Sequence, residues 1–181
     1  MKNTYRIIGK TVIMDLRRES GGTLKCRFDV ADLPKLKALD VAWVAIQDYS
    51  VKSEEKYYVG RNAEGTTLLL HRYLMGEVAD GLVVDHIDGN PLNNKRSNLR
   101  LLTHSQNALN RKGAELRSKS GILGVSWIEC KKRFRGRVKY KGKAVFERLY
   151  KEDELERAEM EVREIREMLI NGTHPIQNQV K

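Results

Sequence analysis

The sequence of 181 residues lacks the long apolar segments and clustered cysteines that mark membrane and secreted proteins. It contains no run of fifteen apolar residues, whereas a membrane-spanning helix needs about 20. Its first ten residues lack the apolar core of a signal peptide. Cys26 and Cys130 lie too far apart to suggest a disulfide framework or a Cys-x-x-Cys zinc site. We therefore expect a soluble, cytoplasmic protein of one to three domains, without membrane contact or structural zinc.

The charge of the chain is concentrated in one stretch. Lys and Arg outnumber Asp and Glu by 34 to 24, a net charge of +10. Residues 111–150 carry 13 basic and 3 acidic groups, which is +10, while the charges of the remaining segments cancel. A local patch of this strength attracts a polyanion and releases its counterions on binding, which favours nucleic acid as the partner. A solvated face or a flexible basic linker is the alternative.

The pattern of residues 131–143 favours a strand over a linker, because basic residues occupy the odd positions and Phe134, Val138 and Tyr140 lie at even ones. A period of two is typical of a strand with one buried face. The Lys141-Gly142 pair suits the following hairpin turn. We predict a cationic sheet face that binds double-stranded DNA. The cations at the odd positions of this stretch are Lys131, Arg133, Arg135, Arg137, Lys139, Lys141 and Lys143.

Residues 1–65 are expected to form an accessory β-rich domain. Asp32 is expected to cap a short helix that ends at Leu39, and Trp43 is assigned to the core. The expected strands cover residues 6–16, 23–30, 41–47, 56–59 and 66–70.

The last third of the chain is expected to form three short strands within residues 121–150 and one helix over residues 153–170. A polar stretch at residues 113–120 is the predicted linker, and residues 173–181 form a tail. The helix carries one apolar stripe, which we expect to cover the preceding sheet; a partner helix or a coiled-coil dimer is the alternative. The stripe consists of Leu155, Ala158, Val162, Ile165 and Leu169.

Residues 82–107 hold the motif that points to chemistry. Two apolar runs flank a turn-rich loop that contains Asp85-His86, and a predicted helix over residues 105–112 follows, capped by Thr103 or Ser105. This stretch resembles the HNH endonuclease family, whose ββα-metal site is named for a His, an Asn and a final His or Asn. In this chain those residues are His86, Asn98 and Asn107.

The resemblance implies a role for each of these side chains in phosphodiester hydrolysis. The neutral imidazole of His86 accepts a proton from water as general base. Asp85 and Asn107 supply oxygen ligands to a hard cation, Mg²⁺ or Mn²⁺. Asn98 hydrogen-bonds loop backbone and keeps His86 in register. Because neighbours on a strand point to opposite faces, the strand must twist or stop near Asp85 and His86.

Other polar residues near the motif have plainer interpretations. Asp88 belongs to a turn, Asn93 and Asn94 are loop residues, and His104 binds a phosphate or caps the helix. His71 lies in the segment that precedes the motif, and the sequence favours a structural role and a role in the site equally. Arg72 and Arg100 are expected to contact DNA.

Residues 121–171 are similar to the ethylene-response-factor type of DNA-binding domain, which lays a three-stranded sheet in the major groove. Arg133, Arg135 and Arg137 match by strand position and face. Phe134 stands where that family usually has tryptophan, and Gly136 where it has alanine, so base preference does not carry over.

Together these observations predict an α+β protein: a small N-terminal β domain, a ββα-metal (His-Me finger) core at residues 66–112, and a C-terminal sheet packed on one long helix at residues 121–172. The predicted function is a metal-dependent homing endonuclease of phage or intron type, a monomer that nicks double-stranded DNA in the host cytoplasm. The alternatives are a DNA-binding regulator with a decayed nuclease site, an RNA-binding or structural basic protein, and a restriction enzyme.

Overall fold

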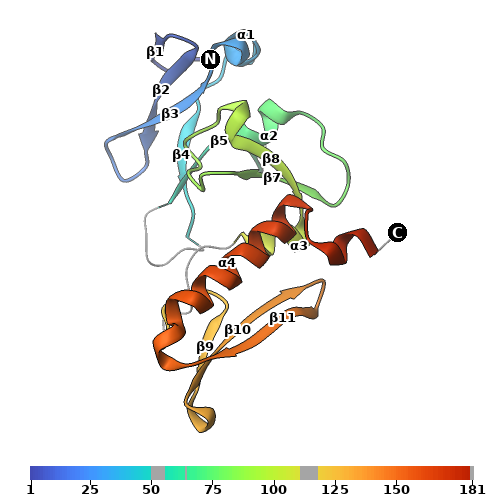
Figure 1. The fold of residues 1–181 in the computed structure, drawn as a ribbon. Helices are drawn as coiled ribbons and strands as arrows, with labels where there is room; N and C mark the ends of the chain where they lie inside the picture. The colour runs from blue at the N-terminus through green and yellow to red at the C-terminus, as the bar shows by residue number, and fades with distance from the viewer. Residues whose placement is uncertain (50–55, 64, 111–117, 180–181) are drawn as a thin grey trace. The chain divides into compact units, whose positions relative to one another are not determined.

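The structure, a computed structural model, describes residues 1–49, 56–63, 65–110 and 118–179 and divides into two units (Figure 1). The first unit is Met1–Leu101 and the second is Leu102–Lys181. Each unit contains a separate cluster of buried apolar side chains. Residues 113–117 of the predicted linker lie outside the described residues, so the predicted domain boundaries stay a prediction.

The first unit is built on a six-stranded sheet. Its strands are β1 Tyr5–Ile8, β2 Thr11–Arg18, β3 Thr23–Asp29, β4 Val44–Gln47, β5 Tyr57–Ala63 and β6 Thr66–Leu69. The order is β1-β2-β4-β5-β6, with β3 also paired to β2. Among the described strands of this sheet, β2 and β4 pair in parallel and the other named pairs are antiparallel. The strand predicted at residues 6–16 is two strands, because Gly9 takes a φ of 55° and turns the chain back on itself.

Two short helices follow strands of this sheet. Helix α1 is Leu33–Ala38 and helix α2 is Leu70–Met75. The prediction that Asp32 caps α1 is wrong, because its side chain makes no capping hydrogen bond and instead binds Arg96. Trp43 is 1% exposed and belongs to the core, as predicted.

The predicted order of strand, loop, strand and helix is present. β7 is Leu82–His86, β8 is Leu99–Thr103, and the two form a separate two-stranded sheet. Helix α3, His104–Leu109, follows β8 directly and begins with a capping box formed by Thr103 and Gln106. β8 contains the division between the two units.

The second unit is a three-stranded antiparallel sheet packed on one long helix. The strands are β9 Val125–Ile128, β10 Arg133–Tyr140 and β11 Lys143–Tyr150, in the order β11-β10-β9. Helix α4, Leu155–Asn171, lies along one face of the sheet (Figure 1). Its predicted apolar stripe packs into the shared core. The three strands, the helix and its covering of the sheet are therefore confirmed within this unit.

Two turns, one at each end, define where β10 begins and ends. Lys141 and Gly142 both have positive φ, 48° and 79°, and join β10 to β11 as the predicted hairpin turn. Before β10, Lys132 has a φ of 49° and ends a short 3₁₀ turn at Glu129–Lys131. Lys131 therefore precedes the strand instead of extending its alternation.

No helix in the described part of the chain combines the length and apolar composition that a bilayer crossing needs.

Candidate active site at the end of strand β7

His86 is the last residue of β7 and lies inside the first unit. It is 5% exposed. Its Nε2 lies 3.3 Å from the Oδ1 of Asn94. Its ring meets the ring of His71 edge to face, with centroids 4.9 Å apart and planes at 72°. Tyr58 of β5 packs near both rings. The imidazole is thus held on several sides.

Burial keeps both histidines neutral. It lowers the pKa of His71 to about 3, with further contributions from His86 and Arg72. Burial also lowers the pKa of His86, although the hydrogen bond to Asn94 and the carboxylates of Asp85 and Asp88 act in the opposite direction. A neutral imidazole can accept a proton at physiological pH, which is the state that a general base requires.

Asp85 precedes His86 and has a different partner. Its Oδ2 accepts a hydrogen bond of 2.9 Å from Nε of Arg100 on β8. Both side chains are largely buried, at 14% and 23% exposed. Arg100, predicted to contact DNA, thus neutralises the carboxylate that was predicted to bind metal. Asp85 and His86 face different partners, Arg100 and Asn94, and β7 ends at His86.

Asn98 ties the two ends of the loop between β7 and β8 together. Its Oδ1 accepts from the backbone N–H of Asp88 at 3.1 Å, and its Nδ2 donates to the carbonyl of Asn93 at 2.8 Å. Its backbone carbonyl accepts from Ile87. These contacts are the loop-bracing hydrogen bonds that the sequence predicted for Asn98. Its assignment as a catalytic residue stays a prediction.

Asp88 forms part of the turn. Although burial acts to raise it, the pKa of Asp88 lies below its usual value because Asn93, the backbone of Asn90 and Asn98 donate hydrogen bonds to the carboxylate. Gly89 takes a φ of 71° at the tip of the turn. The lone pairs of Asp88 are therefore engaged in shaping the loop.

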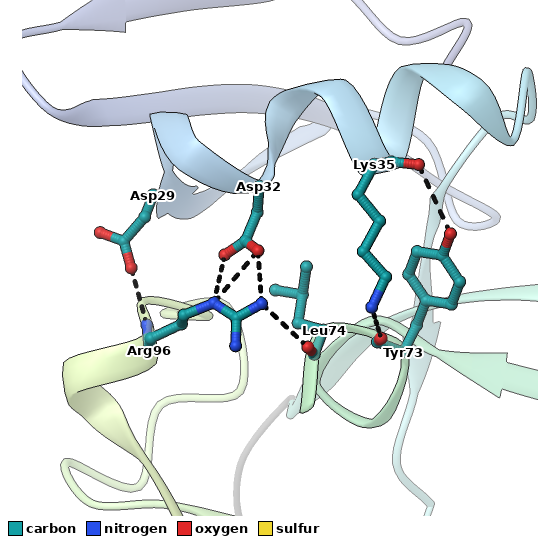
Figure 2. A network of polar contacts seen from close by, with 6 residues as sticks. All are labelled: Asp29, Asp32, Lys35, Tyr73, Leu74 and Arg96. Carbon is teal, nitrogen blue, oxygen red and sulfur yellow. Dashed lines mark hydrogen bonds and ion pairs between the residues drawn. The ribbon is translucent and has the colours of Figure 1, made fainter. Parts of the chain in front are cut away.

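The rest of the loop is anchored to the N-terminal sheet and helix α1, as Figure 2 shows for Arg96. The guanidinium of Arg96 binds Asp32 through three hydrogen bonds of 2.6–3.1 Å and donates to the carbonyl of Leu74 at 3.1 Å. Its backbone N–H donates to Asp29 at 2.8 Å. Nearby, Lys35 donates to the carbonyl of Tyr73 at 2.8 Å. The N-terminal sheet and the loop form one packed body.

The cationic face predicted for residues 131–143 is present on β10 in the second unit. Phe134, Gly136 and Val138 are buried, while the residues between them face outward. Arg133 and Lys139 are exposed. Arg135 and Arg137 lie opposite Glu147 of β11, with nitrogen–oxygen distances of 4.0 and 3.2 Å. The carboxylate of Glu147 thus faces two of the four outward cations of β10.

The remaining predicted residues are exposed. Arg72 lies on α2, Lys131 in the 3₁₀ turn, and Asn107 and His104 on α3 in the second unit. The first unit thus brings together Asp85, His86, Asn98 and Arg100. Sequence reasoning missed Asn94, the direct partner of His86, because nothing in its sequence separates it from an ordinary loop asparagine.

The carboxylate of Asp85 at the end of β7 is a donor of the type that a hard cation prefers. The carboxylate of Asp85 already has a cationic partner in a largely buried setting, and oxygen is the ligand that Mg²⁺ and Mn²⁺ prefer. Within the described ranges, no three His, Cys, Asp or Glu side chains converge on one point. Any ion bound here would therefore use few protein ligands and complete its shell with water and phosphate.

Comparisons with known proteins match this region. Residues 69–109 match the model of an HNH endonuclease family. An uncharacterised HNH endonuclease of Acanthamoeba polyphaga mimivirus is 33% identical over 95 residues, covering 47% of this chain and 50% of that protein. Protein 3.8 of Escherichia phage T7 is 41% identical over 68 residues, covering 38% and 55%. The chain thus spans about half the length of these relatives. No solved structure shows significant similarity. The family match and the named relative together show that residues 69–109 are similar to an HNH endonuclease domain.

Proposed function

We propose that this protein is a metal-dependent DNA endonuclease of the homing type, which nicks one strand of a specific site as a monomer. The observation that carries the proposal is the buried, neutral His86 beside the largely buried Asp85, inside the segment that matches the HNH endonuclease model. A phage protein among the relatives agrees with a mobile, phage-type origin.

In this proposal each residue of the site in the first unit has a separate role in the hydrolysis. His86 takes the proton of the attacking water. Asn98 maintains the loop that follows His86 through its hydrogen bonds. Asp85 supplies a carboxylate oxygen to the cation. A bound Mg²⁺ or Mn²⁺ would stabilise charge on the scissile phosphate and the leaving oxygen. The part of Asn107, which belongs to the other unit, stays a prediction.

Arg100 has two roles in this proposal. It neutralises Asp85 in the structure described here. When a cation and a phosphate are present, its guanidinium can move to the phosphate, because Arg binds phosphate and carboxylate oxygens with the same geometry.

The second unit would hold the target DNA through the outward face of β10. Four cations on one strand, Arg133, Arg135, Arg137 and Lys139, follow the period of the strand and lie on the face opposite α4. Such a row can contact phosphates or guanine edges in a groove.

Nicking of a supercoiled plasmid in Mg²⁺ tests the hydrolytic part. We expect the wild type to give open-circular product and chelator to stop the reaction. His86→Ala should reduce nicking at least about 100-fold, as loss of a general base does, with DNA binding retained. His174→Ala, in the C-terminal segment, is the matched control and should nick like the wild type.

Two outcomes would contradict the hydrolytic part. Equal behaviour of wild type and His86→Ala would favour a DNA-binding regulator with a decayed site. Linear product formed in a single binding event would contradict nicking by a monomer.

The salt dependence of DNA binding tests the part of the second unit. If the basic stretch at residues 131–143, of which β10 is the central part, neutralises about six phosphates, the log–log slope of affinity against salt is about −5. Arg137→Ala should make that slope shallower by about 1. Arg163→Ala, at an exposed position of α4, should leave it unchanged. A slope that responds equally to both substitutions would exclude β10 as the contact face.

A further inference from the structure

We propose that Asn94 is a positioning residue for His86, and that the N-terminal sheet holds Asn94 in the orientation that this role requires. Asn94 is completely buried. It lies in the loop between β7 and β8 and is in hydrogen-bonding distance of His86 at one end of its amide and of Cys26 at the other. The catalytic consequence rests on the proposed nuclease function, whereas the orientation itself does not.

The contacts of Asn94 define which way its amide points. Nδ2 donates to the carbonyl oxygen of Pro91 at 3.0 Å and to Sγ of Cys26 at 3.4 Å. A carbonyl oxygen can only accept, so the NH₂ group must face Pro91. The oxygen Oδ1 therefore faces Nε2 of His86, 3.3 Å away.

This orientation selects one tautomer of His86. Because Oδ1 is only an acceptor, Nε2 must carry the ring hydrogen and donate it. Nδ1 is then the nitrogen with the free lone pair, and it is the atom that can take up a proton. The edge-to-face contact with His71 restricts the rotation of the same ring. Asn94 thus determines which nitrogen is basic, and His71 helps to determine where it points.

The N-terminal sheet supplies the support for Asn94. The backbone N–H of Asn94 donates to the carbonyl of Arg27 at 2.7 Å, and the N–H of Arg27 donates to the carbonyl of Leu92 at 2.8 Å. Arg27 and Asn93 form an isolated parallel bridge, so the loop extends the sheet at the edge of β3.

Arg96, two residues further, is bound to Asp29 and Asp32 (Figure 2). Residues that lie 37 to 43 positions before the HNH segment, from Cys26 to Asp32, thereby form the frame in which His86 is oriented. The domain predicted as accessory is, in this proposal, a structural part of the active site.

The tautomer of His86 can be read directly by long-range ¹⁵N–¹H NMR on the full chain at pH 8.0, without metal or DNA. The signals of His86 are assigned by their absence in His86→Gln. We expect a protonated Nε2 and an unprotonated Nδ1 in the wild type. A protonated Nδ1, or an even mixture of tautomers, would overturn the proposal without recourse to any variant of Asn94.

Variants at Asn94 test the link to activity. Asn94→Ala should give a mixture of tautomers and reduce plasmid nicking by about 10–100-fold, with DNA affinity within about twofold of wild type. Asn94→Asp retains an oxygen toward Nε2 and should recover the protonated Nε2 and part of the rate. Ser97→Ala, at an exposed position of the same loop, is the control and should keep the wild-type tautomer.

The backbone ¹⁵N–¹H spectrum shows whether each variant is folded. If Asn94→Ala does not fold, the tautomer of His86 in the wild type still decides the point. A protonated Nε2 in a protein that never nicks DNA would support the positioning role and refute the nuclease proposal. Full nicking activity in a folded Asn94→Ala protein would refute the positioning role alone.

Discussion

At the scale of single residues, the loop that carries Asn94 depends on one ion pair of unequal burial. The carboxylate of Asp32 is 5% exposed, whereas Arg96 is half exposed. Removing Arg96 would leave the buried carboxylate of Asp32 without its main hydrogen-bond donor. The free energy lost by an unpaired buried carboxylate is larger than the free energy that an exposed ion pair contributes. The pair therefore matters mainly because Asp32 cannot return to water.

We expect Arg96→Ala to lower the free energy of unfolding by about 2 kcal/mol, less than for a fully buried pair because water reaches the arginine. Urea unfolding of the full chain measures this. Lys35→Ala removes an exposed cation of the same network (Figure 2) and should change the value by less than about 0.5 kcal/mol. Equal effects of the two substitutions would show that burial of Asp32 is unimportant.

At the scale of elements, the contact between α4 and its sheet depends on two glycines. A Cβ at Gly136 of β10 would lie 2.9 Å from Val162 and 3.0 Å from Tyr150. A Cβ at Gly124 would lie 2.8 Å from Val162, at a φ of 88° that L-residues rarely adopt. The alanine expected at position 136 from the family resemblance would therefore crowd this helix. Close approach of α4 explains the glycine.

Gly136→Ala should destabilise the second unit by about 1–3 kcal/mol because the added methyl group overpacks the interface. Val162→Ala alone should also destabilise the second unit, by a similar free energy, because it leaves a cavity. The double variant should be more stable than the sum of the two losses predicts, since the new methyl group occupies the vacated space. Thermal unfolding measures all three proteins, and strict additivity would contradict the proposed contact.

At the scale of the whole molecule, the two buried histidines link stability to pH. The pKa of His71 is about 3 in the folded protein and about 6.5 when unfolded. The unfolded state therefore binds the proton first, and stability is fully present above about pH 6.5. It is lost as the pH falls toward 3. The pKa of His86 is lowered as well and acts in the same direction.

From pH 7 to pH 5, we expect the contribution of His71 to cost about 1–2 kcal/mol of stability. His71→Phe keeps a ring in the buried position but cannot titrate, so its stability should fall less over this interval. Urea unfolding at each pH measures both proteins. Parallel pH profiles for wild type and variant would show that His71 is not the group responsible.

Local patterns in the chain were enough to predict several parts of this protein. The alternation at residues 131–143, the stripe of α4 and the Asp85-His86 motif each depend on neighbours in sequence, and strand, helix and loop periodicities express such neighbours directly. The order of elements around the motif and the buried position of Trp43 followed from the same patterns. The turn at Gly9 between β1 and β2 was not predicted, because a single glycine in an otherwise strand-like run also fits a continuous strand.

Other features depended on contacts between segments far apart in the chain. Asp32 looked like a helix cap, because its partner Arg96 lies 64 residues away. Asn94 looked like a loop residue, because Cys26, 68 residues earlier, and His86 meet it only in the folded unit. Short-range pattern thus predicted the elements of the chain and the motif that resembles an HNH nuclease. Long-range packing decided which groups support it, since burial and hydrogen-bond partners arise only when distant segments come together.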